Sequence, residues 1–273
     1  MAHIFDHHVH MDIRNCNDYE AMALAGVTKM LAPVSPTRER KFCVQSYCEH
    51  FDRLANVEPA RAAAFGVELL VALSVNAGDI GDHNAALAAI SEVESRLALE
   101  HVVAVGELAL RTFTELEIEL FRRQLQLGTR SQCPVIIEAP IHTADFERLL
   151  AVLGQAFDDG LARPERVCMI DLNFDKLKAA RQMGLGAYGL PVSPKVDGLF
   201  CLREKLDFRE VLRVLDSFGP DGLMLNSGLH VGFADPLGLP KTILRLRVNG
   251  LDEQTLHLLA SANAEGFFQG HAA

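Results

Sequence analysis

The stretch Ile4-Phe5-Asp6-His7-His8-Val9-His10 decides both the fold and the chemistry that this sequence predicts. If the segment is extended, His8 and His10 project from one face of a strand and His7 projects from the other. Two imidazoles on one face can bind a single cation, and histidine is the commonest side-chain metal ligand. The alternative is a tag remnant or a surface histidine cluster. The apolar residues around the histidines favour a buried strand instead.

Outside this segment, apolar runs of strand length alternate with helical tracts along the whole chain. The runs are apolar throughout, as expected when both faces of a parallel sheet are covered. Eight strand-then-helix units in 273 residues predict one TIM (β/α)8 barrel domain spanning residues 1–273. An open doubly wound sheet would need a glycine-rich turn after the first strand, where this chain has histidines. The expected strands are 4–9, 27–34, 69–75, 102–106, 134–138, 166–170, 186–191 and 222–226.

The helical tracts lie between these strands, and the longest of them, residues 40–65, contains Glu58-Pro59. A proline inside a helix removes a hydrogen bond and clashes with the preceding turn. We therefore expect a break in the helix at this point.

Composition limits the classes of function. The chain is 49% hydrophobic and carries a net charge of −10. This charge disfavours binding along a nucleic-acid backbone, but it does not disfavour a small phosphorylated substrate. We find no apolar run of the roughly 18 residues that a membrane span needs, and no secretory signal. Six cysteines lie scattered without CxxC spacing. This pattern predicts a reduced, cytoplasmic protein with no membrane partner.

Residues with metal-binding side chains follow five of the expected strands. In a TIM barrel the functional site lies at the carboxyl ends of the strands, so these side chains are expected to meet. Each alone is commonly structural, but together they suit one or two divalent ions of Zn, Mn, Fe or Mg. A carboxylate on a central strand can bridge two such ions. The candidate ligands are His8, His10, Glu107 as the bridge, Glu138, Asp171 and His230.

Three motifs resemble those of TatD-type metal-dependent hydrolases in the amidohydrolase superfamily. The resemblance covers nearly the whole chain and extends to a TatD-related branch through Asn226-Ser227, Asp235-Pro236 and Pro240-Lys241-Thr242. It implies a TIM barrel, a divalent-metal centre and hydrolysis of a phosphoester or related bond. The three motifs are Asp6-x-His8-x-His10, Val-Val-Ala-Val-Gly-Glu ending at Glu107, and Asn-Ala-Glu-Gly-Phe-Phe over 263–268.

The chain departs from that family at three ligand positions. The family has histidine where this chain has Glu138 and Asp171, and it has aspartate where this chain has His230. Every replacement can still bind a divalent cation, which predicts a working site with a preference shifted toward Mn²⁺ or Fe²⁺. His142, four residues past Glu138, is an alternative source of an imidazole.

The resemblance implies that a metal-activated water attacks a small, anionic substrate. In the family mechanism the aspartate after the last strand accepts the proton of the nucleophile. Here His230 is the expected base, acting with Glu107, and a surface loop histidine is the alternative. Asp6 is expected to orient a histidine ring.

Three cations follow expected strands and are the candidate substrate-binding residues, although each alone suits a solvated surface. They are Arg14, Arg38 and Lys195. Two other functions stay open at this point: a non-catalytic barrel that binds a metal or another ligand, and a metal-dependent DNA or RNA exonuclease. The acidic charge disfavours the exonuclease. The sequence does not determine the oligomeric state.

Overall fold

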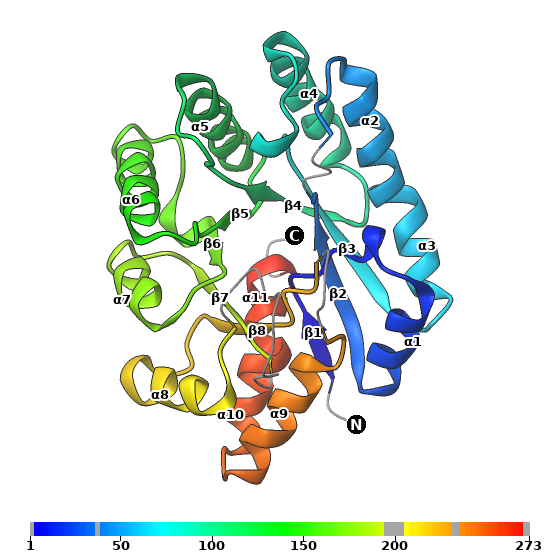
Figure 1. The fold of residues 1–273 in the computed structure, drawn as a ribbon, viewed down its shortest axis with the longest axis vertical. Helices are drawn as coiled ribbons and strands as arrows, with labels where there is room; N and C mark the ends of the chain where they lie inside the picture. Colours follow the sequence, from blue (N-terminus) through cyan, green and yellow to red (C-terminus); the bar gives the residue numbers. More distant parts are fainter. Residues whose placement is uncertain (1–2, 36–38, 194–204, 231–234, 270–273) are drawn as a thin grey trace.

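A computed structural model of the chain describes residues 3–35, 39–193, 205–230 and 235–269. Eight parallel strands form one sheet, and their order in space is their order in the sequence (Figure 1). Helices surround this ring, so the predicted single-domain TIM barrel is confirmed. The strands are β1 Ile4–Asp6, β2 Val27–Pro33, β3 Glu68–Leu73, β4 Val102–Leu108, β5 Val135–Glu138, β6 Val167–Ile170, β7 Ala187–Pro191 and β8 Leu223–Asn226.

The main helices follow the strands that they cover. Many begin at a polar residue whose side chain accepts a hydrogen bond from the first turn, as Thr114 does from the Glu117 backbone N–H. The α-helices are α1 Cys16–Leu24, α2 Val44–Asp52, α3 Glu58–Ala63, α4 His83–Arg96, α5 Glu115–Arg130, α6 Thr143–Asp158, α7 Phe174–Gln182, α8 Phe208–Phe218, α9 Gly238–Val248, α10 Glu253–His257 and α11 Asn263–Gln269. Among the described residues, no helix combines the length and the apolar character needed to cross a bilayer.

Two sequence-based boundaries were wrong. The first strand ends at Asp6. Beyond it, Val9 forms an isolated bridge to Leu229, and its backbone N–H donates to the Leu31 carbonyl of β2 at 3.1 Å. The expected break at Pro59 is absent, because a π turn at Arg53–Val57 connects α2 to α3. Pro59 lies in the first turn of α3, where a missing backbone N–H is tolerated, and the wider π turn relieves the clash before it.

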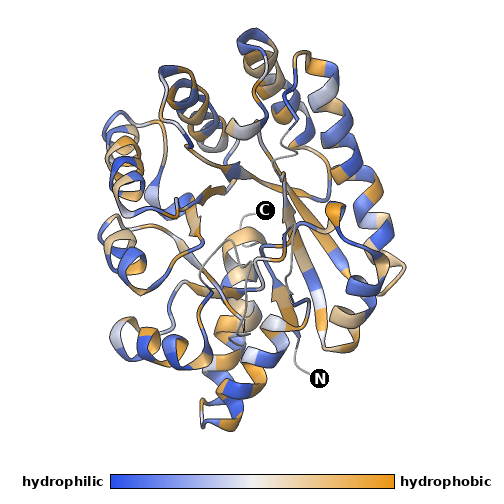
Figure 2. Cartoon of the chain, in the orientation of Figure 1, coloured by the Kyte–Doolittle hydropathy of each residue, from blue (hydrophilic) through white to orange (hydrophobic). Residues whose placement is uncertain are grey.

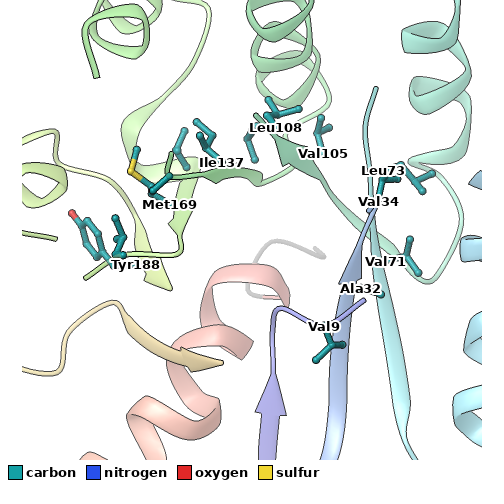
Figure 3. Packing of buried hydrophobic residues seen from close by; sticks show 14 of the residues in the cluster. Val9, Ala32, Val34, Val71, Leu73, Val105, Leu108, Ile137, Met169 and Tyr188 are labelled. Atoms are coloured by element: carbon teal, nitrogen blue, oxygen red, sulfur yellow. The ribbon is translucent and has the colours of Figure 1, made fainter. Parts of the chain in front are cut away.

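Both faces of the sheet are apolar, which explains why the strands lack an alternating pattern (Figure 2). Neighbouring strand residues enter different cores: Val71 packs outward under the helices, whereas Ala72 faces the barrel interior. Figure 3 shows the outer layer, which continues around the sheet through Val105 and Ile137. This packing fixes which residues at each strand end can reach the barrel mouth.

The barrel closes between β8 and β1 with few strand-to-strand hydrogen bonds. The His10 backbone N–H donates to the Leu229 carbonyl at 2.8 Å, near the carboxyl ends of these strands. At the other end, the Asn263 amide donates to the Leu223 carbonyl at 2.8 Å. Phe268 of α11 enters the inner core 6.2 Å from the Phe5 ring. The C-terminal helix therefore completes the barrel at the seam (Figure 1).

Candidate metal centre

Three of the predicted ligands lie together at the carboxyl ends of the strands. His8 and His10 follow β1, and Glu107 lies near the end of β4. One donor atom from each lies within 4.8 Å of the others, and all three residues are buried. The Glu107 Oε2 atom is 3.2 Å from His8 Nε2 and 3.5 Å from His10 Nε2. Two imidazole nitrogens and one carboxylate oxygen therefore point at a common position.

A backbone carbonyl orients the His10 ring, and a carboxylate lies near the His8 ring. His10 Nδ1 lies 3.3 Å from the Pro33 carbonyl, and this contact leaves Nε2 directed at Glu107. His8 Nδ1 lies 3.8 Å from the Asp171 carboxylate. A hydrogen bond from the second ring nitrogen to a carbonyl is typical of metal-ligating histidines, because it fixes the ring orientation, and His10 has this contact. The separation between His8 and Asp171 is too long for a hydrogen bond.

The charge state of Glu107 suits a ligand. Burial acts to raise its pKa, but hydrogen bonds and charge from His10 and His8 outweigh burial and hold that pKa well below its usual range. Metal binding requires an ionised carboxylate. Buried nitrogen and carboxylate donors in this arrangement fit a divalent ion of the Zn, Mn or Fe type.

The other three predicted ligands are not in this group of donors. Among the described residues, only the donor atoms of His8, His10 and Glu107 all lie within 4.8 Å of one another. Asp171 directly follows β6 and approaches His8. Glu138 ends β5, where it accepts a hydrogen bond from Arg111 at 2.5 Å. His230 is half-buried beyond β8, and its backbone carbonyl accepts from Arg14 Nη1 at 3.5 Å.

Of the three predicted substrate-binding cations, one lies within the described residues. Arg14 lies at the same rim as His230 and also donates to Asp18 at 2.7 Å. Arg38 and Lys195 lie outside the described residues. His142, the alternative imidazole, is exposed at the N-cap of α6.

The Asp6 carboxylate has a role that the sequence did not indicate. It accepts a hydrogen bond from the Ser227 backbone N–H at 3.0 Å, and so ties β1 to the end of β8. Burial raises the pKa of Asp6 to about 6. Within the described part of the chain, no hydrogen bond joins its carboxylate to a histidine ring.

His7 is buried inside the barrel beneath the candidate ligands. Its Nε2 atom lies 3.3 Å from the Asn226 amide nitrogen, and its ring stacks on Phe268. Burial, with a smaller contribution from the charge of His8, lowers the pKa of His7 to about 3, so the ring is neutral. The alternation expected for an extended segment, which separates His7 from His8, is the sequence signal for their different surroundings.

A buried chain of polar contacts begins two residues after His10. Asp12 Oδ2 lies 3.4 Å from His50 Nε2, and His50 Nδ1 lies 3.3 Å from Lys41 Nζ. Lys41 in turn donates to Asp79 at 2.5 Å. These residues come from four separate segments, so no sequence spacing could have indicated that they meet.

No protein-family model matches the chain. An uncharacterized metal-dependent hydrolase of Methanocaldococcus jannaschii is 29% identical over 267 residues, which cover 97% of this chain and 100% of the relative. The crystal structure of the TatD-like protein of Archaeoglobus fulgidus has a TM-score of 0.76 at 20% identity, covering 97% of this chain and 99% of the other. The phosphotriesterase homology protein of Escherichia coli, complexed with phosphate in its active site, has a TM-score of 0.69 at 13% identity, covering 98% of each chain.

Proposed function

We propose that this chain, a metal-dependent hydrolase of the TatD type, hydrolyses a small anionic substrate at a centre built on His8, His10 and Glu107. The observation that carries this proposal is the convergence of their three buried donor atoms within 4.8 Å. A divalent ion bound there would supply an activated water and polarise a substrate oxygen. His8, His10 and Glu107 would hold the ion, and the contact to Pro33 orients the His10 ring.

Asp171, Glu138 and His230 remain proposed further ligands of one or two ions. Support is strongest for Asp171, because its carboxylate already approaches His8. Glu138 is buried at the end of β5, next to the strand that carries Glu107. His230 is the proposed base because histidine suits proton transfer near neutral pH and this one follows β8 at the same rim.

An anionic substrate, a phosphoester or related compound, is supported by two observations. Arg14 is the predicted cation at the rim, where it contacts the His230 backbone. The Escherichia coli structural neighbour holds phosphate in its active site. A net charge of −10 disfavours extended nucleic acids as substrates. A cytoplasmic location stays a prediction that rests on the scattered cysteines.

Elemental analysis of purified protein tests the metal centre. We expect at least one divalent ion in the wild type and its loss in the double variant His8→Ala/His10→Ala. His142→Ala is the matched control, because it removes an exposed histidine outside the cluster. Equal, near-zero metal in wild type and double variant would contradict the proposal.

Assays with a panel of phosphoesters, lactones and amides, with added Mn²⁺, Zn²⁺ or Fe²⁺, test the reaction. We expect metal-dependent turnover of at least one anionic ester. Bound metal without turnover across the panel would instead identify a metal-binding barrel that does not catalyse hydrolysis.

A further inference from the structure

We infer that Arg111 binds the anionic group of the substrate beside the metal centre, and that Glu138 and Glu117 hold it in position. This inference rests on the proposed function and extends it to a residue that the sequence motifs do not include. The ligand chemistry is an oxyanion, phosphate or carboxylate, because the guanidinium fork matches either group.

The topology places Arg111 at the rim of the site. It follows the end of β4 by three residues, and β4 carries Glu107. Its Nη2 atom donates to Oε2 of Glu138 at 2.5 Å. Glu138 ends β5, which pairs with β4 through Leu108 and Ile137. The guanidinium therefore reaches from one strand end to the next, on the side of the barrel where the predicted ligands gather.

The side chains of Arg111 and Glu138 differ in their exposure to solvent. The Arg111 side chain is 38% exposed, whereas that of Glu138 is 1% exposed. On the outer surface of α5, by contrast, the side chains of Arg123 and Glu119 are 55% and 38% exposed. A carboxylate buried as deeply as Glu138 needs a charged partner. This pairing therefore anchors one end of the guanidinium while the remainder faces solvent.

Arg111 retains hydrogen-bonding capacity after this pairing. A guanidinium has five N–H donors. Within the described part of the chain, Nη2 is the only side-chain nitrogen of Arg111 with a hydrogen-bond partner. The remaining donors are available to an oxyanion that approaches from solvent.

The backbone that carries Arg111 is held by a second buried carboxylate. Glu117 Oε2 accepts hydrogen bonds from the backbone N–H groups of Arg111, Thr112 and Phe113 at 2.9, 2.8 and 2.9 Å. Its other oxygen accepts from the Thr112 hydroxyl at 2.7 Å. Glu117 therefore fixes this turn to the first turn of α5. A cation fixed in this way loses little conformational freedom when it binds a ligand.

Calorimetric titration of the metal-loaded full-length protein with inorganic phosphate tests the inference, with acetate as the carboxylate probe. We expect Arg111→Gln to weaken binding of the preferred anion by about tenfold or more, the loss typical of a charged hydrogen bond. Arg111→Lys keeps the positive charge but loses the paired N–H donors of the guanidinium. Its anion affinity is expected to lie between those of wild type and Arg111→Gln. Arg123→Gln, which removes an arginine that pairs with an exposed carboxylate on the outer face of α5, is expected to bind the anion like wild type.

A second variant tests whether Glu117 acts on anion binding by holding the backbone of Arg111. Glu117→Gln is expected to weaken anion binding in the wild-type background and to cause no further loss in Arg111→Gln, because both changes act through one guanidinium. A merely structural role would lower thermal stability in both backgrounds without changing anion affinity.

Unchanged anion affinity in Arg111→Gln with wild-type metal content would overturn the inference, as would binding of neither probe by the wild type. Metal content is measured on every sample, so absence of metal from wild type counts against the proposed function alone. The same titrations of metal-free protein then report on Arg111 independently of the metal.

Discussion

The Nδ1 atom of His10 lies 3.3 Å from the carbonyl oxygen of Pro33, the last residue of β2. This contact crosses from one strand end to the next and holds the imidazole with Nε2 facing Glu107 at 3.5 Å. The ring is therefore oriented by the barrel itself. A preorganised ligand of this kind raises metal affinity, because no rotation has to be frozen when the ion binds.

Metal binding is expected to stabilise the fold. At a metal concentration about 100 times the dissociation constant, the free energy of unfolding is expected to rise by about 2.7 kcal/mol. For a chain of this size, that increase raises Tm by about 5–10 °C. Differential scanning calorimetry with Zn²⁺ or Mn²⁺ measures the shift. Chelation with EDTA should reverse it, and His10→Ala should abolish it while His142→Ala retains it. An equal shift in His10→Ala would show that the ion binds elsewhere.

The effect of Asp171 on the candidate metal site can be tested by substitution. Its backbone φ is 61°, a conformation that asparagine and aspartate tolerate better than alanine does. We expect Asp171→Asn to keep the stability of the fold and to lower metal affinity about 10- to 100-fold, since it removes the carboxylate beside His8. Asp171→Ala should show the same loss of affinity and an additional destabilisation of about 1 kcal/mol.

Competition with a chromophoric chelator measures metal affinity for both Asp171 variants, and urea denaturation of the metal-free forms measures stability. Wild-type metal affinity in Asp171→Asn would rule out a role for this carboxylate, either as a ligand or in orienting His8.

The sequence predicted the barrel and the convergence of His8, His10 and Glu107, because both depend on what ends each apolar strand. Glu107 could be assigned from its position after a continuous apolar run. Arg111 could not, because it lies in a loop that has no periodicity, and its pairing with Glu138 depends on the register of β4 and β5. For the same reason, the sequence did not indicate that Asp6 would bond to Ser227, which is 221 residues away. Contacts between distant segments depend on the three-dimensional packing, which local patterns do not encode.

The buried pair of Lys41 and Asp79 is expected to contribute strongly to stability. Their side chains are 8% and 1% exposed and are joined at 2.5 Å. Asp79→Asn leaves the ammonium buried without its counter-charge, which typically costs about 3–5 kcal/mol. Urea denaturation measures the change in the free energy of unfolding.

The matched control for this pair is Lys241→Met. It breaks a contact of similar length, 2.6 Å to Asp235, in which the lysine side chain is 48% exposed. Exposed pairs contribute about 0–1 kcal/mol, so this variant should be nearly as stable as wild type. Similar losses in Asp79→Asn and Lys241→Met would contradict the prediction that burial decides the effect.

Replacing either of two glycines by alanine should change the stability of the fold, but in opposite directions. At Gly189 in β7, a Cβ atom would lie 2.8 Å from Ile170 Cγ2 and 2.9 Å from His7 Nε2, so Gly189→Ala overpacks the inner barrel. We expect the free energy of unfolding to fall by about 1–3 kcal/mol and the His7–Asn226 contact to be disturbed.

At Gly266 in α11, a Cβ atom would meet nothing within 4 Å. Gly266→Ala should therefore stabilise the protein by about 0.5–1 kcal/mol, because alanine loses less backbone entropy in a helix.

Thermal and urea denaturation of the two variants measure these changes, and histidine NMR resonances report on His7. A wild-type His7 spectrum together with unchanged stability in Gly189→Ala would mean that the barrel relaxes around the added methyl group.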